Sequence, residues 1–202
     1  MPAFSKKLVV AGCCALAALG AAGFVFRNLA LWLVVADPLP ASLDAIFTFA
    51  GETHRLVYSK ELFTQYKQAR WLISYPSKKI AVPLGKGGLD TAKITVVDTC
   101  KNTHSEAAFI TQWAASAAAG NAACSPAHPL AVGLVSTPFH MRRIRTEIRK
   151  RASCSACRFF YLPVPFERYG VTRQVYQNWW LSKPLRQAVI LEFEKYLYYL
   201  FT

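Results

Sequence analysis

The strongest constraint on this chain is an apolar stretch near its start, where Leu8 to Phe26 holds no charged residue. A helix rises about 1.5 Å per residue, so this stretch nearly crosses the roughly 30 Å hydrocarbon core of a membrane. Arg27 interrupts the stretch, and Leu29 to Ala36 then resumes it. A single helix from Leu8 to Ala36 would be longer than one membrane crossing requires. We therefore predict one N-terminal transmembrane helix, with Arg27 reaching back to the membrane interface, where Trp32 also fits.

Two other interpretations of the apolar stretch, both as a cleaved signal sequence, are open. Ala15 to Ala22 could hold a signal-peptidase site, which would release the rest of the chain. Val10 to Cys13 imitates a lipoprotein box, although the apolar lead from Lys7 is short for a signal core. We expect a retained anchor, because the apolar stretch continues well past either cleavage site. Residues 1–40 are thus predicted to form a membrane anchor and linker, and residues 41–202 one domain.

The charges that flank the anchor indicate its orientation. Lys6 and Lys7 precede it, whereas Asp37 and Asp44 follow it, with Arg27 against the trend. Segments rich in Lys and Arg are retained in the cytoplasm during insertion. The N-terminus is therefore predicted to lie in the cytoplasm and the domain outside it.

Beyond the anchor, short apolar runs alternate with segments of helical period. The expected strands cover residues 44–51, 71–75, 93–97, 130–135 and 159–162. The expected helices are one with the inner face Leu56, Ser59, Phe63 and Tyr66, then 102–119, 139–151 and a tail from Val175 onward, while Pro76 to Thr91 is a loop or an irregular element. Strands that are apolar on both faces are typical of a mostly parallel sheet covered on both sides. We predict an α/β fold, a Rossmann-like three-layer domain.

Polar residues follow three of the expected strands. In parallel sheets, ligands bind at the carboxyl ends of the strands. The residues at those ends are Gly51, Glu52, His54 and Arg55 after the first strand, Asp98, Asn102, Thr103 and Glu106 after the third, and Ser136, Thr137, His140 and Arg143 after the fourth. From these we predict a ligand-binding set that comprises Gly51, Arg55, Asn102, Thr103, Glu106, His140 and Arg143.

Local structural roles compete with ligand binding at several of these positions. Thr103 and Glu106 match a capping box that would start the helix. Ser136 or Thr137 could cap the next helix, with a proline at its first position. Gly51 could serve only as a turn glycine.

His140 and Arg143 are harder to explain by local structure alone. They share one helical face, which Glu147 continues, while the core stripe is supplied by other residues. We therefore expect them to point away from the core, near a helix start that favours anions. The alternative is an ordinary salt-bridge face, with Asp98 or Glu106 neutralising the arginines internally.

No standard enzyme motif is present: the chain lacks G-x-G-x-x-G, a phosphate-loop lysine motif and a G-x-S-x-G elbow. Ser136 with His140 is conceivable as a nucleophile and its base, but residues four apart at a helix start need not meet. Catalytic residues and cofactors are therefore left unassigned.

The cysteines fall into two groups. Cys13 and Cys14 lie in the anchor, and the domain carries Cys100, Cys124, Cys154 and Cys157. Outside the cytoplasm an even set favours disulfides, and we expect at least one oxidised pair, Cys154 and Cys157 being the nearest in sequence. Free thiols, or a zinc site of three cysteines with His128, are the alternatives.

The charge is strongly positive, at +13. The segment from Arg142 to Arg173 contains nine basic residues and two glutamates, so its net charge is +7. A basic surface near anionic lipid headgroups accounts for this charge. Nucleic-acid binding is not expected, because no recognition motif accompanies the basic residues.

Three short motifs resemble one known family. The first is Asp37-Pro38-Leu39-Pro40, which leads to Gly51 and Arg55; the second is the run from Cys100 to Thr103; the third is the run from Val135 to Arg143. In this order they resemble the SanA/YdcF/ElyC-type family. The chain departs from the family pattern at Glu52, where a second glycine is usual, and at Glu106, which is shifted by one place.

The resemblance implies a Rossmann-like fold behind one helix in the bacterial inner membrane, with the domain on the periplasmic or outer side. It also implies a role in envelope integrity and in peptidoglycan or lipid-carrier metabolism, and a nucleotide-like ligand. We therefore expect a membrane-anchored factor in cell-envelope biogenesis that binds an anionic, phosphorylated or nucleotide-like ligand. The alternatives are a hydrolase or transferase that acts on a lipid-linked envelope precursor, and a non-catalytic scaffold for envelope proteins. The oligomeric state is left open.

Overall fold

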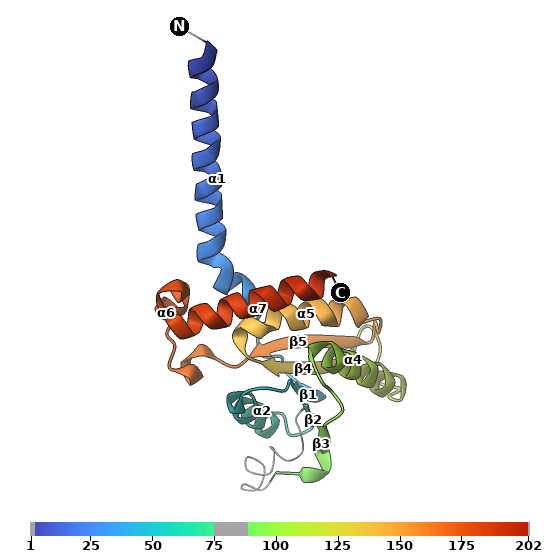
Figure 1. The fold of residues 1–202 in the computed structure, drawn as a ribbon. Coiled ribbons are helices and arrows are strands. Elements are labelled where there is room, and N and C mark those ends of the chain that lie inside the picture. Colours follow the sequence, from blue (N-terminus) through green and yellow to red (C-terminus); the bar gives the residue numbers. More distant parts are fainter. Residues whose placement is uncertain (1–2, 75–88, 202) are drawn as a thin grey trace.

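A five-stranded parallel sheet forms the centre of the domain in the computed structural model, which describes residues 3–74 and 89–201 (Figure 1). The strand order is β3-β2-β1-β4-β5. The strands are β1 (Ala45–Thr48), β2 (Arg70–Ser74), β3 (Ile94–Val97), β4 (Leu130–Ser136) and β5 (Cys157–Pro163). The predicted α/β class and mostly parallel sheet are thus confirmed.

Helices cover both faces of the sheet, as apolar strands require. The helices of the domain are α2 (Thr53–Gln65), α4 (Thr103–Ala119), α5 (Met141–Arg151), α6 (Arg173–Gln177) and α7 (Lys183–Phe201), with the 3-10 turns η2 (Thr91–Lys93), η3 (Pro138–His140), η4 (Phe166–Tyr169) and η5 (Trp179–Leu181). Successive residues of β1 point to opposite faces: Phe47 packs against the side covered by α4 and α5, and Ile46 against the side covered by α2. Each face therefore has its own core.

Most expected elements are present within about two residues of their expected bounds, and the expected helical tail is divided into α6, η5 and α7. The first strand is an exception, because it ends at Thr48 and the chain then turns through Phe49 to Gly51. Most of the expected loop from Pro76 to Thr91 lies outside the described residues; its last residue begins η2.

The N-terminal helix α1 (Ala3–Leu33) is long and apolar enough over Val9–Leu33 to cross a membrane, by length and composition. Its side chains from Val9 to Arg27 are exposed, and it rises clear of the domain in Figure 1. Its last turn is different, since Ala30 and Leu33 are buried against the C-terminal segment of the chain. The expected helix through Ala36 ends three residues early.

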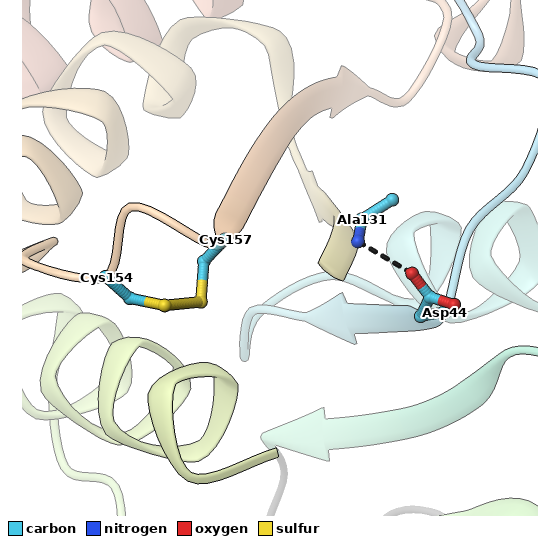
Figure 2. Close-up of a disulfide and its surroundings, with 4 residues drawn as sticks. All are labelled: Asp44, Ala131, Cys154 and Cys157. Atoms are coloured by element: carbon cyan, nitrogen blue, oxygen red, sulfur yellow. Dashed lines mark hydrogen bonds between the residues drawn. A yellow bond between two sulfur atoms is a disulfide. The ribbon is translucent and has the colours of Figure 1, made fainter. Parts of the chain in front are cut away.

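The segment after α1 is tied to the edge of the sheet. The amide of Asp37 donates to the carbonyl of Tyr161 (2.8 Å), and the Tyr161 amide donates to Oδ2 of Asp37 (2.9 Å). Asp44 makes a similar bond, from the Ala131 amide to its Oδ2 at 2.7 Å (Figure 2). These bonds hold the segment between α1 and β1 against β4 and β5.

One disulfide joins Cys154 to Cys157 at the turn that leads into β5 (Figure 2). This confirms the expected oxidised pair, and it excludes the alternative zinc site, because both sulfur atoms are bonded to each other. Cys100 and Cys124 are free. For so short a loop the chain-entropy model gives a stabilisation of about 2 kcal/mol.

Candidate functional site

A cavity of about 250 Å³ lies where the ends of β1 and β4 meet the start of α4. Its lining includes six of the seven residues predicted from the sequence, all except Gly51. The lining residues are Ala50, Arg55, Cys100, Lys101, Asn102, Thr103, Glu106, His140, Arg143, Glu192 and Lys195. The expected convergence of Arg55, Asn102, Thr103, His140 and Arg143 in one pocket is therefore confirmed, while their role in ligand binding stays a prediction.

The start of α4 is capped by a different pair from the one expected. Asn102 accepts a hydrogen bond from the Ser105 amide (2.9 Å), and the Ser105 hydroxyl accepts from the Asn102 amide (3.1 Å). The predicted capping box of Thr103 and Glu106 is therefore wrong. Because Asn102 and Ser105 do the capping, the side chains of Thr103 and Glu106 are available to the pocket.

Glu106 carries a buried carboxyl group in this pocket. Its Oε1 accepts a hydrogen bond from the Ala50 amide at 2.7 Å, which joins α4 to the turn after β1. Burial raises the pKa of Glu106 above its ordinary value of 4.5, and the nearby charges of Arg55 and Arg143 oppose that rise. A raised pKa means that burial favours the protonated form of this carboxyl group, which suits a group that transfers protons.

His140 is buried between two hydroxyl groups. Its Nδ1 lies 3.0 Å from Ser136 Oγ, and its Nε2 lies 3.0 Å from Thr103 Oγ1. Burial lowers the pKa of His140 well below 6.5, and the charges of Arg143 and Arg55 lower it further. The imidazole is therefore neutral at physiological pH.

Both ring nitrogens of His140 are hydrogen-bonded, one as a donor and one as an acceptor, because a neutral imidazole carries a single proton. Thr103 Oγ1 also accepts a hydrogen bond from Arg143. Ser136 and His140 do meet, although residues four apart at a helix start need not do so. Ser136 is fully buried and lies outside the pocket lining, so it is not placed to attack a ligand in the pocket.

Arg143 is held by a carboxylate that sequence reasoning missed. Its Nη2 lies 3.0 Å from Glu192 Oε2 in α7, and its Nε lies 3.2 Å from the same oxygen. The expectation that His140 and Arg143 point away from the core is wrong, because α7 packs over α5 and buries both side chains. Asp98, the other carboxylate considered, is exposed and does not line the pocket.

The acidic residue that continues this face of α5 belongs to a separate cluster. Glu147 pairs with Arg151 (2.7 Å), Lys150 (3.4 Å) and His104 (3.2 Å). The helical face that was predicted to run from His140 through Arg143 to Glu147 therefore carries two separate groups of ion pairs, one around Arg143 and one around Glu147.

Arg55 lies across the turn that follows β1. Its guanidinium donates to the carbonyls of Phe49 and Ala50 and, at 3.1 Å, to Thr137 Oγ1. Gly51 adopts φ +147°, and a Cβ there would lie 2.6 Å from Cζ of Arg55. Gly51 therefore serves as a turn glycine, which is the alternative to ligand binding that was considered for this residue. It leaves room for Arg55 and does not itself line the pocket.

The pocket is positively charged and polar. Arg55, Lys101, Arg143 and Lys195 line it, against the carboxyl groups of Glu106 and Glu192. Sequence reasoning missed Lys101, Lys195 and Cys100. Burial raises the pKa of the Cys100 thiol, with Glu106 contributing, so this cysteine stays protonated at neutral pH and is a poor nucleophile.

The neutral state of His140 predicts acid sensitivity. The folded pKa is lowered, so below pH 6.5 the unfolded chain takes up a proton that the folded protein does not. The stability that His140 contributes is complete above its unfolded pKa and falls with acidification by up to about 1.4 kcal/mol per pH unit. We expect His140→Gln to lose less stability than the wild type between about pH 7 and pH 5, measured by denaturant unfolding.

Glu106→Gln separates this effect from that of the carboxyl group. The raised pKa of Glu106 affects the pH dependence of stability in the opposite direction. The stability that Glu106 contributes is complete below pH 4.5 and is lost as the pH rises through the folded pKa. Glu106→Gln should therefore keep or steepen the acid sensitivity of the wild type. Equal slopes in the wild type and His140→Gln would contradict a neutral, buried imidazole.

Comparison of the chain with models of known protein families, with curated proteins and with solved structures found no match.

Proposed function

We propose that this protein is a membrane-anchored factor of the bacterial cell envelope that binds a small anionic ligand in the pocket at the carboxyl edge of its sheet. The observation that carries the proposal is the set of four cationic side chains around one cavity that holds only two carboxyl groups, of which Glu192 pairs with Arg143 and Lys195. The first amides of α4 add partial positive charge at the same place. A phosphate or carboxylate group suits this lining, as in a phosphorylated or nucleotide-like molecule.

The proposed location is the inner membrane, with the domain on the periplasmic or outer side. Support comes from the apolar helix α1 and from the lysines that precede it. The Cys154–Cys157 disulfide is independent support, because disulfides persist outside the reducing cytoplasm. The envelope role in peptidoglycan or lipid-carrier metabolism rests on the resemblance to the SanA/YdcF/ElyC-type family.

A second candidate function is a hydrolase or transferase that acts on a phosphorylated, lipid-linked precursor. Glu106 favours it, since a buried carboxyl group with a raised pKa beside Arg55 and Arg143 has the properties of a general base. Ser136 does not favour it, because it is buried outside the pocket lining. The third option, a scaffold, would use the basic surface and would not need the pocket.

Inorganic pyrophosphate is a suitable probe of the pocket. We expect the full chain in detergent micelles to bind it, and we expect Lys101→Ala with Lys195→Ala to weaken binding by about tenfold, or about 1.4 kcal/mol. Both lysines line the pocket, and neither side chain is buried, so the fold should persist. The matched control is Lys67→Ala, an exposed lysine between α2 and β2 that is outside the pocket.

Titration calorimetry measures the affinity, and native mass spectrometry of the same sample shows whether a ligand is retained from the cell. Equal affinities in the double variant and the control would contradict the pocket as the anion site. Release of phosphate that is lost in Glu106→Gln would favour the enzyme over the binding protein.

A further inference from the structure

The C-terminal helix α7 carries large apolar side chains on its outer surface. Ile190, Leu197, Leu200 and Phe201 are 40%, 39%, 43% and 87% exposed. Together with Phe193 they recur every three or four residues, so they lie along one side of the helix, which the exposed Glu194 shares. We call the five apolar residues on this side the apolar stripe of α7.

The apolar stripe lies beside the membrane anchor. Trp32 of α1 makes edge contacts with Phe193 (6.2 Å between ring centroids) and Tyr196 (4.9 Å). Arg142 lies over the Trp32 ring at 4.7 Å and donates to the Trp32 carbonyl at 2.7 Å. The side of α7 that carries the stripe is therefore the side from which α1 leaves the domain.

A second contact marks the level at which α1 leaves the domain. Arg27 lies over the ring of Trp180 at 5.9 Å, and Trp179 Nε1 donates to the Arg27 carbonyl at 3.4 Å. The side chains of α1 are exposed from Val9 to Arg27, whereas Ala30 and Leu33, after Arg27, are buried against the domain. Tryptophan and arginine at the end of an apolar span are typical of the membrane–water interface.

The orientation of α7 suits a membrane surface at the level of Arg27. Figure 1 shows α7 lying crosswise to α1, at the end of the domain from which α1 emerges. A helix in this position runs along a membrane that α1 crosses. Lys183 and Arg186 in its first turn suit the anionic headgroups there.

We infer that α7 is an interfacial helix, which inserts its apolar stripe into the same bilayer that holds α1. The inference rests on the membrane anchorage in the proposed function and adds a second point of attachment. Side chains of this kind exposed on a helix beside a membrane span are typical of helices that lie in the interface plane.

This attachment fixes the orientation of the pocket. Glu192 and Lys195 line the pocket and project from a different side of α7, because each residue turns the helix by about 100°. With its stripe in the bilayer, α7 holds the pocket close beneath the headgroups. The ligand it would then meet is an anionic group presented at the membrane surface.

Spin labels at single cysteines test the inference in the full chain. Cys13, Cys14, Cys100 and Cys124 are replaced by serine, the disulfide is kept, and the protein is placed in vesicles of phosphatidylethanolamine and phosphatidylglycerol. Labels are attached at Ile190→Cys and Leu197→Cys. Val57→Cys in α2 is the matched control, because Val57 is 42% exposed, against 40% and 39% for the two test sites.

The measurement is the ratio of collisions with oxygen, which enters lipid, to collisions with a water-soluble nickel chelate. We expect this ratio at Ile190 and Leu197 to be several-fold higher than at Val57. A ratio equal to that at Val57, or shielding from both reagents as in contact with a second copy, would overturn the inference. Leu16→Cys in α1 separates the two proposals: a label there in water would refute the anchorage itself, whereas one in lipid leaves the anchorage intact whatever α7 does.

Discussion

Arg143→Ala should lower the free energy of unfolding by about 2–3 kcal/mol, because Glu192 and Thr103 lose a charged hydrogen-bond donor while Glu192 keeps Lys195 as a partner at 3.3 Å. The side chains of Arg143 and Glu192 are only 7% and 16% exposed, and two guanidinium nitrogens contact the carboxylate. Arg143 also donates to Thr103. Its loss therefore removes one partner of the Glu192 carboxylate in α7 and one donor to the Thr103 hydroxyl in α4, which weakens the contact of α5 with both helices.

The chain offers a matched control for this ion pair. Arg168 and Glu61 lie 2.5 Å apart, but both side chains are 44% exposed. Water and salt screen such a pair, so Arg168→Ala should cost at most about 1 kcal/mol. Denaturant unfolding in detergent micelles, followed by near-ultraviolet circular dichroism, measures both variants.

A double variant separates pairing from packing. Arg143→Met with Glu192→Leu removes both charges together, and it should recover much of the stability, since a buried pair can often be replaced by apolar side chains at little cost. Equal losses in Arg143→Ala and Arg168→Ala would show that Glu192 does not hold Arg143. The arginine would then be available to a ligand, as the sequence alone predicted.

Gly51→Ala should cost about 2–4 kcal/mol and weaken pyrophosphate binding, because it strains the backbone and displaces Arg55. At φ +147° an L-residue is disfavoured, and the new methyl group would lie 2.6 Å from Arg55 Cζ. The guanidinium cannot move freely, since it is buried and bonded to Phe49, Ala50 and Thr137.

Gly170→Ala is the control that isolates backbone strain. Gly170 also has a positive φ, +66°, but a Cβ added there would have no neighbour within 4 Å among the described residues. This variant should cost about 1–2 kcal/mol and leave pyrophosphate binding unchanged. If both variants bind pyrophosphate as the wild type does, Arg55 has no part in the anion site.

Local sequence patterns were sufficient for the elements of the fold. The strands contain apolar runs such as Leu130 to Val135, and the sheet needs them to be apolar because helices cover both of its faces. The same patterns located most of the pocket. Since parallel strands end at one edge of a sheet, polar residues that follow different strands, such as Arg55 and His140, had to come together there.

Partnerships between side chains were decided by the tertiary structure. By spacing, the start of α4 could be capped either by Thr103 with Glu106 or by Asn102 with Ser105. Asn102 and Ser105 form the cap, and Glu106 instead accepts a hydrogen bond from the Ala50 amide, 56 residues away in the chain. Only the packed fold shows that amide to be within reach.

The sequence by itself determined the long apolar N-terminal helix, the layered α/β domain and most of the residues that meet at the carboxyl edge of its sheet, because these follow from hydrophobic period and strand direction. The tertiary structure alone decided that His140 is neutral and that Glu192 holds Arg143. Both depend on α7, which packs over α5 and removes water from the pocket wall. Burial by a distant helix leaves no local pattern, since desolvation depends on what covers a group and not on its neighbours in the chain.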